Sequence, residues 1–413
     1  MSCLGNPPNL KWSQLRFFNF PGDLTVNGLF PYYFDIKFFF SALYRSFFDR
    51  SKINAKLGFR RFLFLILFVP FYLLLQAVNV LCTIVDEIFF RGYKDIEVKK
   101  PLFIVGVPRS GTTFLHRMLS KDEQFTAIKS WEMIFAPTIT QKLFWRGFGK
   151  LDALIGAPLY KGYVFLEKSV ASDFNKIHKV GLFETEEDEV LFLTSFTSCY
   201  LYFFFPDYRL IENYVYFDEK LSPEMRQKIM GFRHLLIKKH MYVFGPDKIY
   251  MTKNPADCGK IASIFDEFPD AEMVYLVRTP YECVPSVMNL YANMYNIANG
   301  PMDNAHLKEL ARLSTIYWYQ YAGDTVEKYP EEHRIIVKYS DLVAQPKATA
   351  EKIYATLNYE MTDKFHQTLE EEEEKASKYT SKHHYDVSTH GLTVEEITEN
   401  YASVFSRYEI ETV

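Results

Sequence analysis

The sequence predicts an α/β fold in which helices flank a parallel sheet, with an apolar helical N-terminal extension before it. Three observations support this prediction. A short β-branched run, 102–107, leads through a glycine-bounded loop into an amphipathic helical pattern. Short apolar runs and amphipathic runs alternate again between residues 248 and 357, as in parallel strands joined by crossover helices. Residues 62–85 form an apolar run without a single charged side chain.

The loop after the first predicted strand contains Gly106 and Gly111, which have the spacing of a phosphate-binding loop. Such a loop directs backbone N–H groups and a helix N-terminus at an anion. Thr112 stands where a nucleotide triphosphatase has its lysine, and Thr113 adds a second hydroxyl. The positive charge of the loop comes instead from Arg109. The pattern therefore predicts a P-loop-like sheet whose anion site is adapted to another ligand.

The composition excludes some classes of protein. The 413 residues include 17% aromatic side chains, a share that suggests a membrane-facing surface or an apolar cavity. The formal net charge of −4 offers no basic excess, so we expect no nucleic-acid partner. Five widely spaced cysteines fit neither a disulfide framework nor a zinc site. Together with the absence of an Asn-x-Ser/Thr motif, they predict a cytoplasmic protein.

Residues 1–95 form an aromatic-rich, helical N-terminal region without a signal-peptide pattern. The run 62–85 is just long enough to span a bilayer. Arg60 and Arg61 precede it, so a single span would separate the catalytic half from a cytosolic nucleotide. Pro70 suggests a kink or a helical hairpin lying in the membrane interface. A peripheral or monotopic helix on the cytoplasmic membrane face, a buried core helix and a spanning anchor stay open.

Residues 96–413 form the predicted catalytic domain, whose start is marked by a charged stretch from residue 86. We expect strands at 102–107, 125–129, 248–252, 272–277 and 334–338. We expect mostly helical structure at 140–245 and helices at 258–268, 281–294 and 346–357. Two acidic runs, 184–189 and 370–374, are predicted to be solvated faces, and 375–391 a loop that could close over a ligand.

Five segments together resemble the PAPS-dependent sulfotransferases, in particular the bacterial-type branch of that superfamily; PAPS is 3′-phosphoadenosine-5′-phosphosulfate. The resemblance spans about residues 100–405. Its most specific part is the loop Pro-Arg-Ser-Gly-Thr-Thr, supported by an arginine and a serine eight positions apart. The segments are 103–113 (FIVGVPRSGTT), 129–137 (KSWEMIFAP), 250–255 (YMTKNP) with 268–271 (FPDA), 277–286 (VRTPYECVPS) and 384–396 (HYDVSTHGLTVEE).

The resemblance implies a PAPS site built from two groups of residues. Arg278 and Ser286 would grip the ribose 3′-phosphate, since a guanidinium takes a phosphate bidentately and the hydroxyl adds a bond. The strand before Arg278 ends in that cation rather than in a magnesium-binding acid, so we expect no metal. The 5′-phosphosulfate would be bound by Arg109, Ser110, Gly111, Thr112 and Thr113.

The resemblance also suggests catalytic groups. Glu132, just past the second predicted strand, would be the general base, and Lys253 would stabilise the leaving oxygen. Related enzymes have a histidine two or four residues after this lysine, where this chain has Pro255 and Asp257. No histidine base can therefore be assigned by position. The alternatives are His116, His178 and His306.

The predicted function is transfer of a sulfuryl group from PAPS to a hydroxyl of an apolar acceptor: a sterol, another lipid alcohol or a phenol. The apolar acceptor is inferred from the aromatic region 190–217 and from the apolar N-terminus. Two alternatives are a nucleotide-dependent kinase on the same scaffold and a non-catalytic, membrane-associated binding protein. The sequence does not indicate an oligomeric state.

Overall fold

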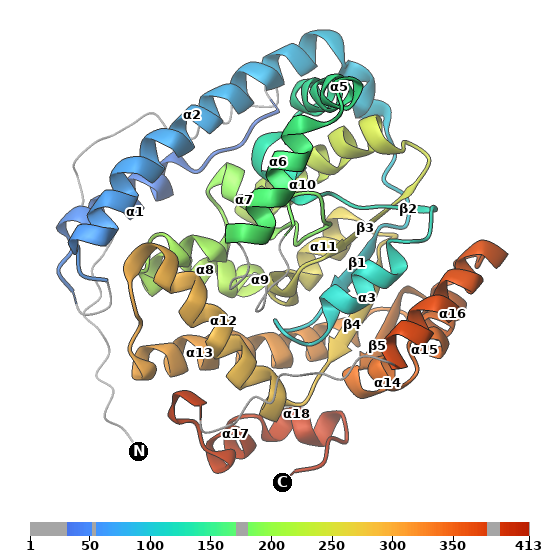
Figure 1. The fold of residues 1–413 in the computed structure, drawn as a ribbon. Coiled ribbons are helices and arrows are strands. Elements are labelled where there is room, and N and C mark those ends of the chain that lie inside the picture. Colours follow the sequence, from blue (N-terminus) through green and yellow to red (C-terminus); the bar gives the residue numbers. More distant parts are fainter. Residues whose placement is uncertain (1–30, 52–54, 171–180, 378–388, 413) are drawn as a thin grey trace.

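The computed structural model describes residues 31–51, 55–170, 181–377 and 389–412. Its centre is a five-stranded parallel sheet in the order β2-β3-β1-β4-β5 (Figure 1). The strands are β1 (Leu102–Val105), β2 (Phe125–Thr126), β3 (Ile249–Lys253), β4 (Glu272–Val277) and β5 (Arg334–Lys338). The predicted α/β class with a parallel sheet is therefore confirmed.

The central strand β1 lies between β3 and β4, with Ile104 paired to Lys253 on one side and to Val274 on the other. Parallel strands end at the same edge of a sheet. The loop after β1, the last residue of β3 and Arg278 just after β4 therefore come together. This register explains how segments almost 180 residues apart can build one site.

Alternate side chains of the strands enter two separate cores, as expected for a sheet covered on both faces. Phe103, Val105 and Tyr275 pack with the helices of the larger core. Leu102 and Ile104 pack on the opposite face. That smaller core is closed by α3 (Thr112–Leu119), α14 (Tyr339–Ala344), α15 (Pro346–Leu357) and α16 (Asp363–Ser377).

The remaining elements surround the larger core or extend beyond it. The α-helices are α1 (Ile36–Phe48), α2 (Phe59–Phe89), α4 (Ser130–Phe135), α5 (Ile139–Leu154), α6 (Pro158–Val170), α7 (Glu189–Ser195), α8 (Tyr208–Val215), α9 (Phe217–Lys220), α10 (Pro223–Phe244), α11 (Ile261–Glu267), α12 (Pro280–Asn299), α13 (Asn304–Val326), α17 (Val394–Asn400) and α18 (Ala402–Arg407). The 3-10 turns are η2 (Arg91–Asp95), η3 (Cys199–Phe203), η4 (Pro255–Gly259), η5 (Glu331–His333) and η6 (Thr389–Gly391).

Most predicted elements are confirmed, and the differences have local causes. Strand β2 is shorter than predicted: it ends at Thr126, and Lys129 pairs instead with Thr185 in an isolated antiparallel bridge. The helix expected at 258–268 is divided into η4 and α11 at Lys260, whose backbone φ of −125° is not helical. The predicted closing loop falls mainly on 378–388, outside the described residues.

The apolar run 62–85 forms α2, a single helix that runs along one edge of the molecule (Figure 1). The helix continues through Pro70, so the prediction of a helical hairpin is wrong. Thirteen of its large apolar side chains are exposed, which excludes a buried core helix. Among the described residues, α2 is the one helix that could cross a membrane by length and composition.

The face of α2 that touches the protein carries polar side chains. Gln76, Asn79, Thr83 and Asp86 are buried and recur every three or four residues along one stripe. Asp86 accepts hydrogen bonds from the first backbone N–H groups of α5 at 2.9 and 2.8 Å, which caps that helix. It also pairs with buried Lys239 of α10 at 3.0 Å. This carboxylate therefore ties α2, α5 and α10 together.

Replacing Asp86 by Ala should destabilise the protein by about 3–5 kcal/mol, because it leaves the ammonium of Lys239 buried without its carboxylate. Urea unfolding, followed by circular dichroism in a mild detergent, measures the change. Ile88→Ala is the matched control, since Ile88 lies two residues away with an exposed side chain. Equal unfolding midpoints for both variants would contradict the role given to Asp86.

Candidate active site

The loop between β1 and α3 has the conformation of an anion cradle. Gly111 adopts a φ of 98°, and a Cβ there would lie 2.5 Å from the ring of Tyr339. A Cβ on Gly106 would lie 2.6 Å from the carbonyl oxygen of Leu276 in β4. Both positions therefore require glycine for space, and position 111 also for its left-handed backbone. Arg109 is held at a φ of 73°, a conformation that non-glycine residues rarely adopt.

The groups around this loop fit an anionic ligand. Ser110 is fully buried, and its hydroxyl oxygen has no hydrogen-bond partner in the part of the chain that the structure describes. Thr112 and Thr113 form the first turn of α3, where backbone N–H groups have no acceptor within the helix. Such N–H groups and the helix dipole favour a phosphate or sulfate oxygen.

Arg109, Ser286 and Arg278, predicted to bind different parts of the donor, lie together at this loop. The Nε of Arg109 donates to the hydroxyl of Ser286 at 2.9 Å. Arg278 donates to the carbonyl oxygen of Arg109 at 2.9 Å and lies over the ring of Tyr339 at 4.1 Å. Glu282 pairs with the same guanidinium at 2.7 Å. Two guanidinium groups and a hydroxyl thus border one side of the loop.

Lys253, the last residue of β3, connects the loop to an acidic segment. Its side chain is fully buried, and its ammonium donates to the hydroxyl of Thr113 at 3.0 Å. The same ammonium pairs with Glu187 at 2.8 Å and with Glu186 at 3.4 Å. The cation predicted to act at the leaving oxygen therefore lies between the anion loop and two carboxylates.

The prediction of a solvated acidic face at 184–189 is wrong. Glu186, Asp188 and Glu189 are buried. Helix α7 begins only at Glu189, so Glu186 and Asp188 lie in the segment before it. Charge patterning alone favours exposure, but buried cations from distant parts of the chain pair with these acids. The sequence held no local signal for this burial, because Arg233 and Lys260 lie in stretches that contain other charged residues.

A network of buried ions holds the acidic segment in place. Arg233 of α10 donates to Asp188 through two nitrogens, at 2.9 and 2.7 Å, and pairs with Asp257 at 2.6 Å. Burial opposes its charge, yet the two carboxylates hold the pKa of Arg233 above its usual value. Lys260 pairs with buried Glu189, and the amide of Asn254 donates to Glu189 at 3.0 Å.

Glu187, the partly exposed partner of buried Lys253, is the functional candidate that sequence reasoning missed. One carboxylate oxygen pairs with Lys253, and the other accepts a hydrogen bond from the hydroxyl of Tyr200. Burial and the nearby carboxylate of Glu187 raise the pKa of Tyr200 well above its usual value, so the phenol stays a donor. Tyr200 belongs to the aromatic region 190–217, most of which fills the larger core.

Glu132, the predicted general base, lies in a different environment. Its carboxylate is buried, with one oxygen accepting from the backbone N–H of Lys129 at 3.1 Å. The other oxygen lies 2.7 Å from Nδ1 of His240 and 3.7 Å from Nζ of Lys142. Although burial opposes ionisation, His240 and Lys142 lower the pKa of Glu132. Its role as a base stays a prediction.

The three alternative histidines differ in environment. His116 of α3 is fully buried, and burial together with the charge of Lys253 lowers its pKa to about 3. It is therefore neutral near pH 7. His306 contacts the hydroxyl of Tyr202 through Nε2. His178 lies outside the described residues.

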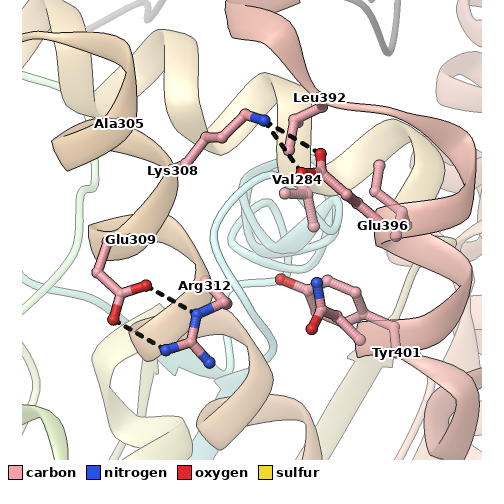
Figure 2. Close-up of a pocket in the computed structure, with 10 residues that line it drawn as sticks. Val284, Ala305, Lys308, Glu309, Arg312, Leu392, Glu396 and Tyr401 are labelled. Atoms are coloured by element: carbon pink, nitrogen blue, oxygen red, sulfur yellow. Dashed lines mark hydrogen bonds and ion pairs between the residues drawn. The ribbon is translucent and has the colours of Figure 1, made fainter. Parts of the chain in front are cut away.

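A pocket of about 230 Å³ between α12, α13 and α17 does not coincide with this site (Figure 2). Its charged side chains pair with one another: Lys308 with Glu396 at 3.1 Å, and Arg312 with Glu309 at 2.8 Å. None of the predicted site residues lines it. We therefore assign it no role in the chemistry.

The parallel sheet, the anion loop and the cations at its edge define a P-loop-like group-transfer enzyme. The chain belongs to the Sulfotransferase family, whose model matches residues 101–363. Omega-hydroxy-beta-dihydromenaquinone-9 sulfotransferase Stf3, from Mycobacterium bovis and Mycobacterium tuberculosis, is 24% identical over 83% of this chain and 84% of its own.

Two solved structures show the same fold. Sulfotransferase STF9 from Mycobacterium avium has a TM-score of 0.66 at 17% identity, covering 88% of each chain. Sulfotransferase STF1 from Mycobacterium tuberculosis H37Rv has a TM-score of 0.53 at 19% identity, covering 78% of this chain and 82% of its own. The predicted resemblance is thus confirmed, and the protein is a sulfotransferase-family enzyme.

His116 should make the stability of the protein depend on pH. The folded state disfavours its charged form, so the unfolded state binds more protons between the two pKa values, about 6.5 and about 3. Stability from this residue is present above pH 6.5 and falls by about 1.4 kcal/mol per pH unit as the pH drops toward 3. Urea unfolding of wild type and His116→Gln at pH 7 and pH 5 measures it. A stability difference between the two proteins that does not change with pH would contradict this assignment.

Proposed function

We propose that this enzyme transfers a sulfuryl group from PAPS to a hydroxyl of an apolar acceptor. The observation that carries the proposal is the position of Lys253, which bonds to Thr113 of the anion loop and to Glu187. A single ammonium thus lies between a site for the donor and a carboxylate able to act on an acceptor.

The donor half of the site supports PAPS. Family membership implies this donor, and the loop residues 109–113 offer one cation, hydroxyls and the backbone N–H groups of the first turn of α3 for its phosphosulfate. Arg278 and Ser286, joined to the loop through Arg109, would hold the 3′-phosphate. Binding this phosphate would draw the guanidinium of Arg278 away from Glu282 and from the carbonyl oxygen of Arg109.

In the proposed reaction, Glu187 takes the proton of the acceptor hydroxyl as that oxygen bonds to sulfur. The bond between sulfur and the bridging oxygen of the donor breaks in line, and PAP leaves with that electron pair. Lys253 stabilises the negative charge that develops on the bridging oxygen. Tyr200 orients the carboxylate of Glu187 by its hydrogen bond. Glu132 is the alternative base; like Glu187, it bonds to protein groups through both oxygens, here Lys129 and His240.

The acceptor is proposed to be a lipid alcohol or sterol-like molecule. The related mycobacterial enzyme is named for a hydroxylated menaquinone. In this chain, Tyr200 stands at the edge of the aromatic region, with the ring of Phe203 at 6.2 Å. A kinase on the same scaffold is disfavoured, because the family assigns sulfuryl transfer and β4 ends before Arg278 rather than an acid.

Changing both Arg278 and Ser286 to Ala should weaken PAP binding by about 100-fold, the loss expected for charge-assisted bonds to a phosphate. Isothermal titration with PAP, the desulfated product of PAPS, measures the affinity. Titration with ATP and magnesium tests the alternative that the protein is a kinase. Arg312→Ala is the control, since Arg312 pairs with Glu309 outside the site. Unchanged PAP affinity in the double variant would overturn the donor assignment.

Glu187→Gln should lower kcat by about 100-fold or more, because the amide cannot accept the proton, while PAP affinity stays close to wild type. Turnover is followed with radiolabelled PAPS and three acceptors: cholesterol, a long-chain alcohol and 2-naphthol. Glu309→Gln, which removes an exposed carboxylate from another ion pair, should keep full activity.

Glu132→Gln separates the two candidate bases. If Glu187 is the base, this variant should lose stability, because the ion pair with His240 and Lys142 is broken, with the kcat of its folded fraction little changed. A large loss of kcat in Glu132→Gln together with an active Glu187→Gln enzyme would transfer the role to Glu132.

A further inference from the structure

Helix α2 has the reverse polarity of a helix on the surface of a soluble protein. Its outward side carries Leu67, Leu74 and Leu81, each more than 60% exposed. Its inward side carries the buried polar stripe that includes Gln76 and Asn79. A helix facing water places its polar side chains outward. The outer side of α2 is therefore suited to an apolar medium.

The inward contacts hold α2 against the body of the enzyme along most of its length. Arg61 near its start donates to Ser46 of α1 at 3.0 Å. Tyr72 in the middle donates to the carbonyl oxygen of Leu193 at 2.6 Å, and Asp86 near the end caps α5. A helix attached in this way cannot cross a bilayer alone. Its inner side stays on the protein, and only its outer side is available to a lipid surface or another apolar partner.

A second exposed surface, which we call the cationic segment (residues 143–161), begins in α5 beside α2 (Figure 1). Its exposed cations are Arg146, Lys150 and Lys161. Asp152 is its one carboxylate, and that group is buried, accepting from the first N–H groups of α6 at 3.0 and 3.1 Å. The exposed apolar side chains between the cations are Leu143, Phe144, Trp145, Phe148, Leu151, Leu154, Ile155, Leu159 and Tyr160.

We propose that the outer side of α2 and the cationic segment together dock on an anionic lipid bilayer. Aromatic and aliphatic side chains enter the interface, and the three cations meet lipid phosphates and carboxylates. A second copy of this chain is a less suitable partner. In a two-fold symmetric contact, the cationic segment of one copy would face the same positive segment of the other. The inference does not rest on the proposed function, since it concerns binding without donor or acceptor.

Flotation of the full chain with vesicles tests the proposal. The protein should float with vesicles of phosphatidylcholine and phosphatidylserine, and more weakly with phosphatidylcholine alone. Arg146→Glu with Lys150→Glu should reduce partition into the anionic vesicles by at least about tenfold, because each cation near an anionic surface contributes to binding. Leu67→Gln with Leu74→Gln should reduce partition into both kinds of vesicle.

The matched control is Lys328→Glu with Lys352→Glu, which makes the same change of net charge at exposed lysines after α13 and on α15. This variant should float like wild type. Failure of the wild type to float would overturn the proposal, as would equal loss in both charge-reversal variants. A stable dimer by light scattering that does not float would assign the surface to a second copy instead. PAP titration on the same proteins shows independently whether the donor site is intact.

Discussion

The buried ion network around Arg233 is the constraint on which the site depends. Moving ions out of water costs several kcal/mol each, so such groups persist only with close partners of opposite charge. Arg233 meets this requirement with Asp188 and Asp257, and Lys260 with Glu189. The acidic segment 184–189 therefore has one placement that satisfies its charges. Glu187, next to Asp188, is held at Lys253 as a consequence.

The network and the sheet position different halves of the site. The sheet register sets the donor half, because β1, β3 and β4 end at one edge and deliver the loop, Lys253 and Arg278 there. The network sets the half that we propose to face the acceptor, because it fixes a segment with no strand of its own. The two halves meet at the ammonium of Lys253. A change in either half therefore alters the surroundings of the same cation.

Local patterns explain what could be predicted from the sequence. Strands 272–277 and 334–338 and the helix 346–357 begin and end where expected, since apolar runs and prolines at helix starts are short-range signals. The assignment of residues 109–113 to an anion loop is a prediction from the same kind of local signal, the spacing of Gly106 and Gly111. The burial of Asp188 could not be, because it depends on Arg233, 45 residues further along the chain. A run of acids without that partner is normally solvated.

In helix α2, the sequence shows where the polar side chains lie but not which side of the helix faces the protein. The polar spacing of Gln76, Asn79, Thr83 and Asp86 is visible in the sequence, but it does not say whether the polar side faces water or protein. The structure places it against the protein, where Asn79 accepts from Gln141 at 2.9 Å. The helix is therefore amphipathic with its polar side on the protein and its apolar side exposed.

The same helix contributes aromatic contacts toward the acceptor side. Phe64 and Phe68 of α2 stack on Phe204 with ring centroids 5.9 and 5.1 Å apart. Phe204 directly follows η3, the turn that contains Tyr200, whose hydroxyl bonds to Glu187. The short turn η3 thus joins the aromatic side chains that pack against α2 to the tyrosine that bonds to the carboxylate beside Lys253. An apolar acceptor held by such contacts would keep its hydrocarbon near the lipid while its hydroxyl reaches the polar site, which is the arrangement that sulfation of a membrane-borne alcohol requires.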